Sequence, residues 1–446
     1  MATNPDLTEL LGSVHANLER GLLPAEVFAD PAIYEEEMER IFQRAWVFLA
    51  HDSEIPEPGD FVRRRIGEDS FIVARDEARR VRVFFNACRH RGVPICESDR
   101  GRATHFRCQY HGWTFRNDGR LVGAPAWAKA YRGLNREEWG LLEADQVAEV
   151  HGLWFACLDP TAPSLDEWLG DMRWYLDLVF GAFPEGWEVW GDPHRWVIRC
   201  NWKIPAENFG TDDYHLLWLH RSNEQIGYFQ VPLEYNMEGY HVQAGNGHGL
   251  SFSIAPTPDD PGPHYWGYPE ELVAMIQRNP RLSPAQQDLA NRSRVAVGTV
   301  FPNWSFLALP LSPDPKTSEP VGYMTIRIWQ PAGPTATEAW SWVLVPRGSS
   351  EGYRQTAYRA AMATFSPGGS FEADDVKPWE GVTATAKSRF WLRRGRFYNY
   401  QMGLSEDMSS ARLVSDWPGP GVVYSPRYEE NQQRGFYRRW LELMQR

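Results

Sequence analysis

The sequence contains 446 residues, which is long enough for two or more domains with a substantial core. Its hydrophobic (43%) and charged (23%) fractions are typical of a soluble globular protein, and the net charge of −12 argues against nucleic acid or an anionic membrane as a partner. No stretch reaches the roughly 20 apolar residues that a membrane span needs, and residues 1–16 are too polar for a secretory signal. Five cysteines, an odd number, fit a reducing compartment, so we expect a cytoplasmic protein.

The first predicted elements are an amphipathic helix and a small β domain. Asp30 and Pro31 are typical of a helix start, and apolar residues recur at helical spacing through residues 33–42. We expect residues 1–44 to form a helical segment that packs on the larger C-terminal domain. Short β-rich runs follow at 61–62, 71–73, 81–85, 114–115, 120–122 and 153–157. They predict an antiparallel β domain over residues 45–164 that ends in the proline-containing connector 159–164.

Residues 165–446 mix helical and extended patterns and are predicted to form a second, larger domain. In chain order we expect a helix at 165–180, a strand at 195–200, paired strands at 323–329 and 339–345, and helices at 353–365 and 426–445. The predicted fold class is therefore α+β: a small antiparallel β domain and a larger domain whose antiparallel sheet is covered by helices.

Two short loops in the β domain each offer one cysteine and one histidine: Cys88-Arg89-His90 and Cys108-Gln109-Tyr110-His111. A Rieske [2Fe–2S] cluster needs this pairing, because one iron takes both sulfurs and the other takes both imidazoles. Glycines at 92 and 112 allow the backbone to turn tightly around the cluster. The alternatives are a zinc site, in which cysteine usually pairs with cysteine, or four unrelated residues. The other cysteines (Cys96, Cys157 and Cys200) are expected to be buried small apolar residues.

A second candidate site lies in the stretch from Asn201 to His220. His215 and His220 follow the carboxylates Asp212 and Asp213, and two imidazoles with one carboxylate form the facial triad of non-heme Fe(II) oxygenases. A spacing of five residues does not place both rings on one face of a regular helix, so a shared metal requires a bulge or a widened turn between Tyr214 and His220. The alternative is a helix with two structural histidines and a solvated acidic pair.

The motifs Cys88–Gly92, Cys108–Trp113 and Asn201–Asn208 resemble those of the large (α) subunit of Rieske non-heme iron ring-hydroxylating dioxygenases, such as naphthalene and biphenyl dioxygenases. The resemblance runs from about residue 42 to 390. It implies a mononuclear iron held by His215, His220 and Asp375, the last being the second aspartate of Phe371-Glu372-Ala373-Asp374-Asp375. Spacing alone does not distinguish Asp375 from Asp374 or Asp213 as the third ligand, and the alternative expectation for those two is a solvated carboxylate.

The resemblance also implies an activity and partners. Both atoms of O2 would enter an aromatic ring to give a cis-dihydrodiol, with electrons from NADH delivered by a separate reductase, usually with a ferredoxin, because the chain has no dinucleotide-binding fingerprint. Asp212 would bridge His111 of one subunit to His215 of the next, within an α3 or α3β3 oligomer that contains small β subunits. Asn208 is a further candidate catalytic residue.

The predicted substrate pocket contains Asn208, Phe209, Leu216, Phe365 and Phe371, each of which has plain core packing as its alternative. The matched segments 208–220, 303–311 and 365–375 contain no Lys or Arg, which favours an uncharged aromatic substrate. Competing interpretations are a related oxygenase that acts on an aromatic carboxylate, a monooxygenase or demethylase, and a Rieske electron carrier. Iron analysis separates the last, since the enzyme would contain about three irons per chain and the carrier about two.

Overall fold

The computed structural model describes residues 5–229, 232–257, 259–260 and 262–446 of a chain that divides into two compact units. The small unit comprises Phe42–Leu165, and the large unit comprises Met1–Ile41 together with Asp166–Arg446. Each unit contains antiparallel sheets, and helices accompany the sheet of the large unit. The predicted α+β class is therefore confirmed.

The small unit is built from three antiparallel sheets, with strand orders β5-β4-β3-β6, β10-β11-β2 and β7-β8-β9. Strands β3 and β4 are joined by a two-residue turn in which Gly67 has a φ of 54°, as the first central position of such a hairpin requires. The strands are β2 (Val47–His51), β3 (Asp60–Ile66), β4 (Asp69–Arg75), β5 (Val81–Phe85), β6 (Arg100–Arg102), β7 (His105–Arg107), β8 (Thr114–Arg116), β9 (Leu121–Gly123), β10 (Gln146–Val150) and β11 (Leu153–Cys157), with one short helix, α3 (Trp127–Ala130).

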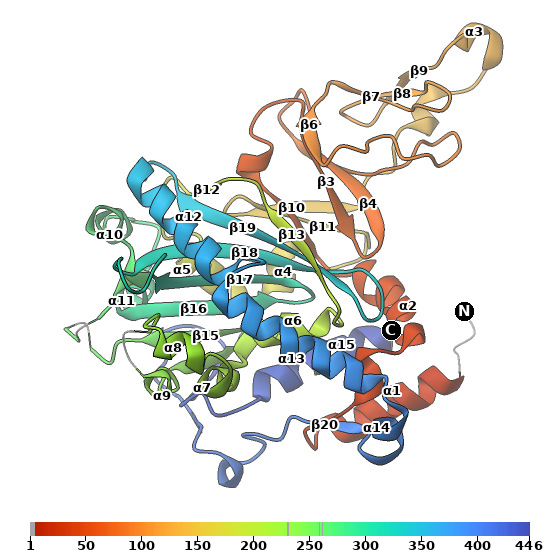
Figure 1. Ribbon diagram of the computed structural model, residues 1–446. Coiled ribbons are helices and arrows are strands. Elements are labelled where there is room, and N and C mark those ends of the chain that lie inside the picture. Colours follow the sequence, from red (N-terminus) through yellow and green to blue (C-terminus); the bar gives the residue numbers. More distant parts are fainter. Residues whose placement is uncertain (1–4, 230–231, 258, 261) are drawn as a thin grey trace. The chain divides into compact units, whose positions relative to one another are not determined.

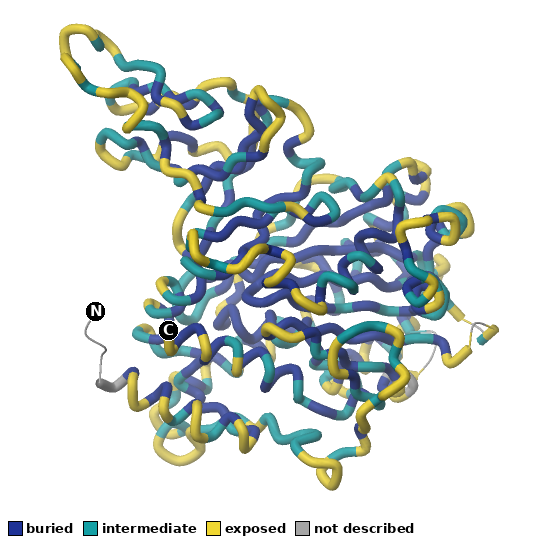
Figure 2. The backbone as a smooth tube through the Cα atoms, turned by 180° about the vertical axis from the view of Figure 1, so that it is seen from behind, coloured by how far each residue is buried: buried dark blue, intermediate teal, exposed yellow. Residues whose placement is uncertain are grey.

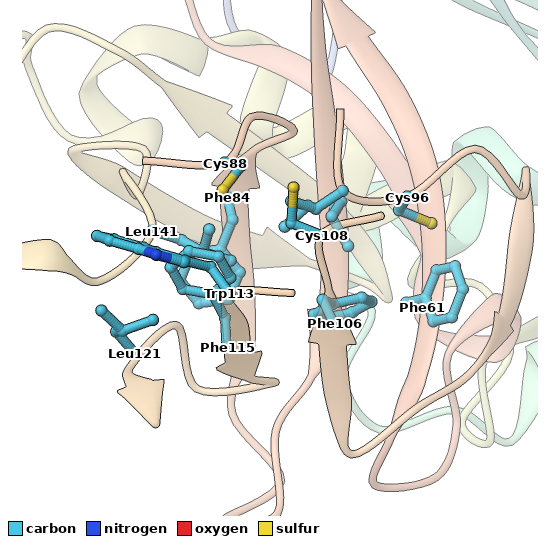
Figure 3. Packing of buried hydrophobic residues seen from close by; sticks show 13 residues of the cluster. Phe61, Phe84, Cys88, Cys96, Phe106, Cys108, Trp113, Phe115, Leu121 and Leu141 are labelled. Carbon is cyan, nitrogen blue, oxygen red and sulfur yellow. The ribbon is translucent and has the colours of Figure 1, made fainter. Parts of the chain in front are cut away.

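An apolar cluster in the small unit brings the two Cys/His loops together. Rings from separate strands, including Phe61, Phe84 and Phe106, pack with Cys88 and Cys108 in this cluster. Figure 3 shows these two cysteines near one another at one edge, whereas Cys96 lies apart from them, next to Phe61. Burial of these large rings fixes the position of the two loops, because aromatic side chains contribute most of the packing energy in a small core.

The large unit is organised around a ten-stranded antiparallel sheet of order β12-β19-β18-β17-β16-β15-β14-β22-β21, in which β13 also pairs with β19. Its central strands are buried along most of their length (Figure 2). The strands are β12 (Trp187–Val189), β13 (His194–Ile198), β14 (Tyr240–Gln243), β15 (Gly249–Ile254), β16 (Ser293–Val300), β17 (Trp304–Leu311), β18 (Val321–Pro331), β19 (Thr337–Pro346), β21 (Arg412–Leu413) and β22 (Val422–Ser425). The predicted pairing of the strands at 323–329 and 339–345 is confirmed by β18 and β19.

Helices cover this sheet and supply the segments that carry the second site. Helix α12 packs on β17, β18 and β19 and lies across the sheet in Figure 1, and helix α6 contacts β15–β18. The helices of the large unit are α1 (Pro5–Leu18), α2 (Pro31–Glu37), α4 (Leu165–Leu169), α5 (Met172–Val179), α6 (Lys203–Thr211), α7 (Leu216–Leu219), α8 (Arg221–Gln225), α9 (Leu233–Asn236), α10 (Glu270–Gln277), α11 (Pro284–Arg292), α12 (Glu351–Phe365), α13 (Ser370–Ala386), α14 (Arg389–Arg394) and α15 (Asn431–Met444). Short strands β1 (Leu22–Pro24) and β20 (Phe397–Asn399) pair with each other.

A fully buried carboxylate connects the N-terminal segment to the rest of the large unit. Glu37, at the end of α2, accepts hydrogen bonds from the indole nitrogens of Trp202 (2.9 Å) and Trp440 (2.7 Å) and forms an ion pair with Lys203. Because all of these partners are buried, the contacts hold α2, α6 and α15 together, and removal of one partner would leave an uncompensated buried charge.

Two predicted helices differ from those observed. The helix expected at 165–180 is divided into α4 and α5, because Gly170 between them adopts a φ of +50° that ends the first helix. The helix expected at 426–445 begins only at Asn431, and residues 426–430 form an irregular segment instead. Among the residues described, no helix is both long and apolar enough to cross a membrane.

Candidate metal centres

The two Cys/His loops of the small unit have the same backbone structure. In the first, the Cys88 N–H donates to Val93 O (2.8 Å) and the Gly92 N–H donates to Cys88 O (2.8 Å). In the second, the Cys108 N–H donates to Trp113 O (2.8 Å) and the Gly112 N–H donates to Cys108 O (3.0 Å). The two glycines have φ values of 72° and 70°, a left-handed conformation that glycine adopts without steric cost. The sequence pattern of the two loops therefore corresponds to a matched pair of turns.

Four side-chain donors meet between these loops. The thiols of Cys88 and Cys108 are neighbours and are buried, and the rings of His90 and His111 lie 4.5 Å apart between centroids. Trp113 stacks on His90 with an interplanar angle of 6°. The Nδ1 atoms of both histidines are buried and have no hydrogen-bond partner in the described part of the chain. Buried polar atoms without a partner are rare, and two of them beside two thiols are explained by a bound group.

The spacing of these four donors fits a cluster better than a single ion. Donors on one tetrahedral zinc ion lie about 3.3–3.8 Å apart, given bonds of about 2.0–2.3 Å. Among the described residues, the only set of three or more His, Cys, Asp or Glu donors within 4.8 Å of one another is His215, His220 and Asp375. The Cys/His donors are therefore spread more widely than one zinc ion requires, as expected for a two-iron cluster bound at both ends.

The other cysteines are buried and free, as predicted. Burial raises the pKa of Cys157 to about 11 and that of Cys200 to about 12, so both thiols remain protonated and unreactive.

The second donor set, in the large unit, is formed by His215, His220 and Asp375. Asp375 Oδ1 lies 3.6 Å from His215 Nε2 and 3.2 Å from His220 Nε2. This oxygen is buried and makes no hydrogen bond to any described residue, so neither contact has hydrogen-bond geometry. All three atoms instead face a common point, which is the arrangement expected around a single metal ion.

Breaks in the helix bring the two histidines together. Helix α6 ends where Asp212 adopts φ −87° and ψ 65°, a 3₁₀ turn follows at Asp213–His215, and α7 ends at His220 with ψ 13°. The predicted bulge or widened turn between Tyr214 and His220 is not observed: a tighter 3₁₀ turn ends at His215, and the helix that follows it is interrupted at His220. The tighter turn changes the direction of the His215 ring and compensates for the five-residue spacing.

Hydrogen bonds to the outer ring nitrogens leave both Nε2 atoms available as ligands. His215 Nδ1 donates to the backbone oxygen of Asp212, and His220 Nδ1 donates to Asp374 Oδ2 (3.3 Å). Asn223 Nδ2 also donates to Asp374 Oδ2 (2.8 Å), so the expectation of a solvated Asp374 is wrong. A carboxylate that holds the outer nitrogen of a ligating imidazole fixes its tautomer and orientation. Sequence spacing did not reveal that Asp374 orients His220. The position of Asp374 next to the predicted ligand Asp375 is the signal that could have indicated it.

All of the predicted pocket residues line one cavity together with the three donors. Asn208, Phe209, Leu216, Phe365 and Phe371 lie on its wall, and so does Asp212. Sequence reasoning missed six other lining residues: Phe229, Ser253, Val295, Val297, Leu307 and Leu309. Four of these residues alternate along β16 and β17, where Val297 pairs with Leu307. Alternation identifies one face of a strand, but the strand pairing decides which face meets the cavity.

Two charged residues that were not predicted for this site also line the cavity. Asp213 is buried and pairs with Arg427, with 2.7 Å between Oδ1 and Nη1, so the expectation that Asp213 is solvated is wrong as well. Arg427 comes from the irregular segment that precedes α15. Its role was not foreseen because residues 426–445 were predicted to be one helix.

A second cavity shares part of its lining with the first. Asn208, Asp212 and His215 line both cavities, and Asn208 Nδ2 donates to Asp212 Oδ2 (3.0 Å). The second cavity also contains Glu207 and Glu430, and burial raises the pKa of Glu207 to about 8 and that of Glu430 to about 7. The Asp212 side chain is 40% exposed, so this carboxylate is accessible from outside the substrate cavity.

Two donor sets of these kinds on one chain define a Rieske-type non-heme iron oxygenase, and comparison with known proteins supports the same class. The Rieske [2Fe-2S] domain profile matches residues 45–139, and the profile of the ring hydroxylating alpha subunit (catalytic domain) matches residues 165–446. The chain therefore belongs to the family of ring-hydroxylating α subunits.

Individual relatives are similar over nearly the whole chain. The α subunit of an N,N-dimethyl phenylurea N-demethylase from Sphingobium sp. (strain YBL2) is 37% identical, covering 98% of this chain and 95% of the relative. Biphenyl 2,3-dioxygenase subunit alpha from Rhodococcus jostii (strain RHA1) is 35% identical, covering 95% and 89%. The crystal structure of naphthalene 1,2-dioxygenase from Rhodococcus sp. bound to indole has a TM-score of 0.93 at 39% identity, covering 99% of this chain and 98% of that chain.

Family membership settles the general chemistry. The protein is an oxidoreductase and the α subunit of an oxygenase component, with a Rieske [2Fe–2S] cluster and a mononuclear iron as cofactors and O2 as co-substrate.

Proposed function

We propose that this chain is the terminal oxygenase of an aromatic dioxygenase system that adds both atoms of O2 to a ring and forms a cis-dihydrodiol. The observation that carries the proposal is the convergence of His215 Nε2, His220 Nε2 and Asp375 Oδ1 at the edge of a largely apolar cavity. These three residues would hold the mononuclear iron. A ferrous ion with three protein ligands has open positions and supplies the activation of O2 beside the bound ring.

The remaining residues of the cavity would bind and orient the substrate. Phe209, Phe365 and Phe371 offer flat apolar surfaces, and Leu216 and the β16–β17 side chains add further apolar lining that would exclude water. Asp374 and the backbone oxygen of Asp212 keep protons on the Nδ1 atoms of the two histidines. Asn208 is hydrogen-bonded to Asp212 and would keep that carboxylate beside His215.

Cys88, His90, Cys108 and His111 would hold the Rieske cluster, which is where electrons enter. The electrons would come from NADH through a separate reductase and a ferredoxin, in the cytoplasm, whose reducing conditions fit a chain whose five cysteines, all of them in the described part, form no disulfide. Asp212 would bridge His215 to His111 of a neighbouring subunit in an α3 or α3β3 assembly that contains small β subunits. The exposed Asp212 carboxylate, which lines both cavities, supports this role.

A neutral aromatic compound is the substrate class that the cavity favours. Among its described lining residues Arg427 is the only Lys or Arg, and Asp213 already neutralises that charge. An aromatic carboxylate would therefore enter without an available cationic partner. The biphenyl- and naphthalene-dioxygenase relatives support a hydrocarbon, whereas the N-demethylase relative supports a second candidate, oxidative removal of a methyl group from a neutral N-methylated arylurea.

Turnover of a small substrate panel tests this function. The purified chain, with a ferredoxin, a reductase and NADH, is given biphenyl, naphthalene, N,N-dimethyl phenylurea and benzoate under labelled O2. We expect cis-dihydrodiols that contain two labelled oxygen atoms and about three irons per chain. Formaldehyde release from the urea alone would favour the demethylase, and turnover of benzoate alone would contradict the neutral substrate class. About two irons without turnover would indicate an electron carrier.

A further inference from the structure

Asp213 lies in the 3₁₀ turn between Asp212 and His215 and is the starting point of a buried chain of charges. Its Oδ1 lies 2.7 Å from Arg427 Nη1, and its Oδ2 lies 2.8 Å from His241 Nε2. On the other side of the imidazole ring, His241 Nδ1 lies 2.6 Å from Glu429 Oε1. Arg427 also donates to Ser251 Oγ (2.8 Å). The four charged side chains are between 0% and 8% exposed.

The geometry specifies the charges in this network. His241 has a carboxylate oxygen within hydrogen-bond distance of each ring nitrogen, so both nitrogens carry protons and the ring is an imidazolium. Burial lowers the pKa of His241, but the hydrogen bonds that its ring donates to Asp213 and Glu429 outweigh burial and raise the pKa overall. The order of charges is therefore Glu429 negative, His241 positive, Asp213 negative and Arg427 positive. The network is neutral as a whole, which allows four charges to remain buried.

The segment that carries the two iron-site histidines has few other buried attachments. Between Asp212 and Asn223 the buried side chains are Asp213, His220 and Asn223, while Tyr214 and Trp218 are 53% and 79% exposed. His220 and Asn223 hold the end of the segment through Asp374. At its beginning Asn208 donates to the part-exposed Asp212, and Asp213 makes the buried charged contacts, with His241 on β14 and Arg427 before α15.

We propose that Asp213 is a positioning residue of the mononuclear iron site: the Glu429–His241–Asp213–Arg427 network fixes the turn that directs His215 Nε2 toward His220 and Asp375. The proposal rests on the function proposed above, since it assumes that these three residues hold iron. Without the Asp213 carboxylate the turn loses two charge-assisted hydrogen bonds, and the His215 end of the segment is no longer anchored to β14 and to the residues before α15.

The test compares iron binding and site geometry in Asp213→Asn and Arg427→Lys. Asp213→Asn is close to isosteric but removes the charge, whereas Arg427→Lys keeps the charge and removes the fork of donors. We expect 10- to 100-fold weaker Fe(II) binding, of the order found when an outer hydrogen-bond partner of a metal ligand is lost. The electron paramagnetic resonance spectrum of the ferrous nitric oxide adduct should also broaden into several species, while the Rieske signal stays unchanged.

Glu37→Gln is the matched control, because it removes a buried charge from the same unit outside the iron site. This variant should have a lower melting temperature than the wild type, and its nitric oxide adduct should give the same spectrum as that of the wild type. Wild-type Fe(II) affinity and spectrum in Asp213→Asn would overturn the proposal, and so would an equal loss of iron in the control. If Asp213→Asn does not fold, the Fe(II) affinity and nitric oxide spectrum of Arg427→Lys test the proposal in its place. A wild-type protein that binds no third iron would refute the proposed function instead.

Discussion

The two metal centres are built in opposite ways. The Cys/His site lies within residues 88–111 of the small unit, on two loops with matching hydrogen bonds that each place one thiol and one imidazole. The His/His/Asp site joins residues 215, 220 and 375 of the large unit, from a broken helix and from α13. The first centre depends mainly on local turns, and the second depends on the packing of distant elements.

This difference has a physical consequence. A local turn is stabilised by its own backbone hydrogen bonds and glycine conformations, so distant substitutions change it little. A site assembled from separate elements changes whenever one element shifts, and an error of about 1 Å at a metal site is enough to impair function. The following substitutions test whether the two centres respond as separately as their construction implies.

Asp375→Ala should have the largest effect. It removes the carboxylate that faces both Nε2 atoms, so we expect loss of the mononuclear iron and a fall in hydroxylation of about a thousandfold or more, equivalent to roughly 4 kcal/mol. Iron analysis should still find the two irons of the cluster, and its visible absorption should be unchanged. Loss of that absorption would show that the two centres are coupled structurally.

Asp212→Asn should leave both centres occupied and nearly abolish hydroxylation, by about a hundredfold or more. The substitution preserves the backbone oxygen that accepts from His215 Nδ1 but removes the negative charge that would connect neighbouring subunits. Single-turnover oxidation of the reduced cluster in the presence of substrate measures this step directly. Asp407→Asn, at an exposed position of the large unit, serves as the control. Full activity of the Asp212 variant would refute the bridging role.

The sequence predicted the local centre and the main features of the fold. Cys88, His90, Cys108 and His111 are close in the chain, so their spacing and the following glycines describe the whole loop pair. The extended stretches 323–329 and 339–345 were predicted as a pair, and they lie in the paired strands β18 and β19. For such features, local propensity and the final fold agree.

The remainder of the iron site depends on tertiary contacts that local patterns do not encode. The left-handed Gly170 divides a segment that reads as one helix. Residues 426–430 lie between strand β22 and helix α15, and their charged side chains pair Arg427 with Asp213 and Glu429 with His241. In the sequence Asp213 and Asp374 resemble surface carboxylates. Their partners, Arg427 and Asn223, are identified only in the folded structure. Charged residues without an obvious local partner are therefore the positions at which prediction from this sequence is weakest.

The smallest expected effect concerns the large unit alone and arises at His248, in the turn between β14 and β15. Its ring is fully buried: Nε2 donates to Trp168 O (2.9 Å), and Nδ1 accepts from the Phe301 N–H (2.9 Å). One nitrogen must therefore carry a proton and the other must not. Burial, together with the positive charge of Arg439, lowers the pKa of His248 to about 4, although the Trp168 carbonyl opposes the shift.

This shift predicts an acid-sensitive large unit. Between about pH 6.5 and 4 the unfolded chain binds a proton at His248 that the folded chain excludes. The free energy of unfolding therefore decreases as the pH is lowered through that range, by up to roughly 3 kcal/mol. His248→Gln retains a donor for Trp168 and cannot titrate, so it should remove this part of the pH dependence. Urea unfolding at about pH 7 and pH 4.5 should show the difference by tryptophan fluorescence, while the visible absorption of the cluster reports the small unit separately. Equal acid sensitivity in the variant and the wild type would mean that groups elsewhere in the large unit, and not His248, take up the proton.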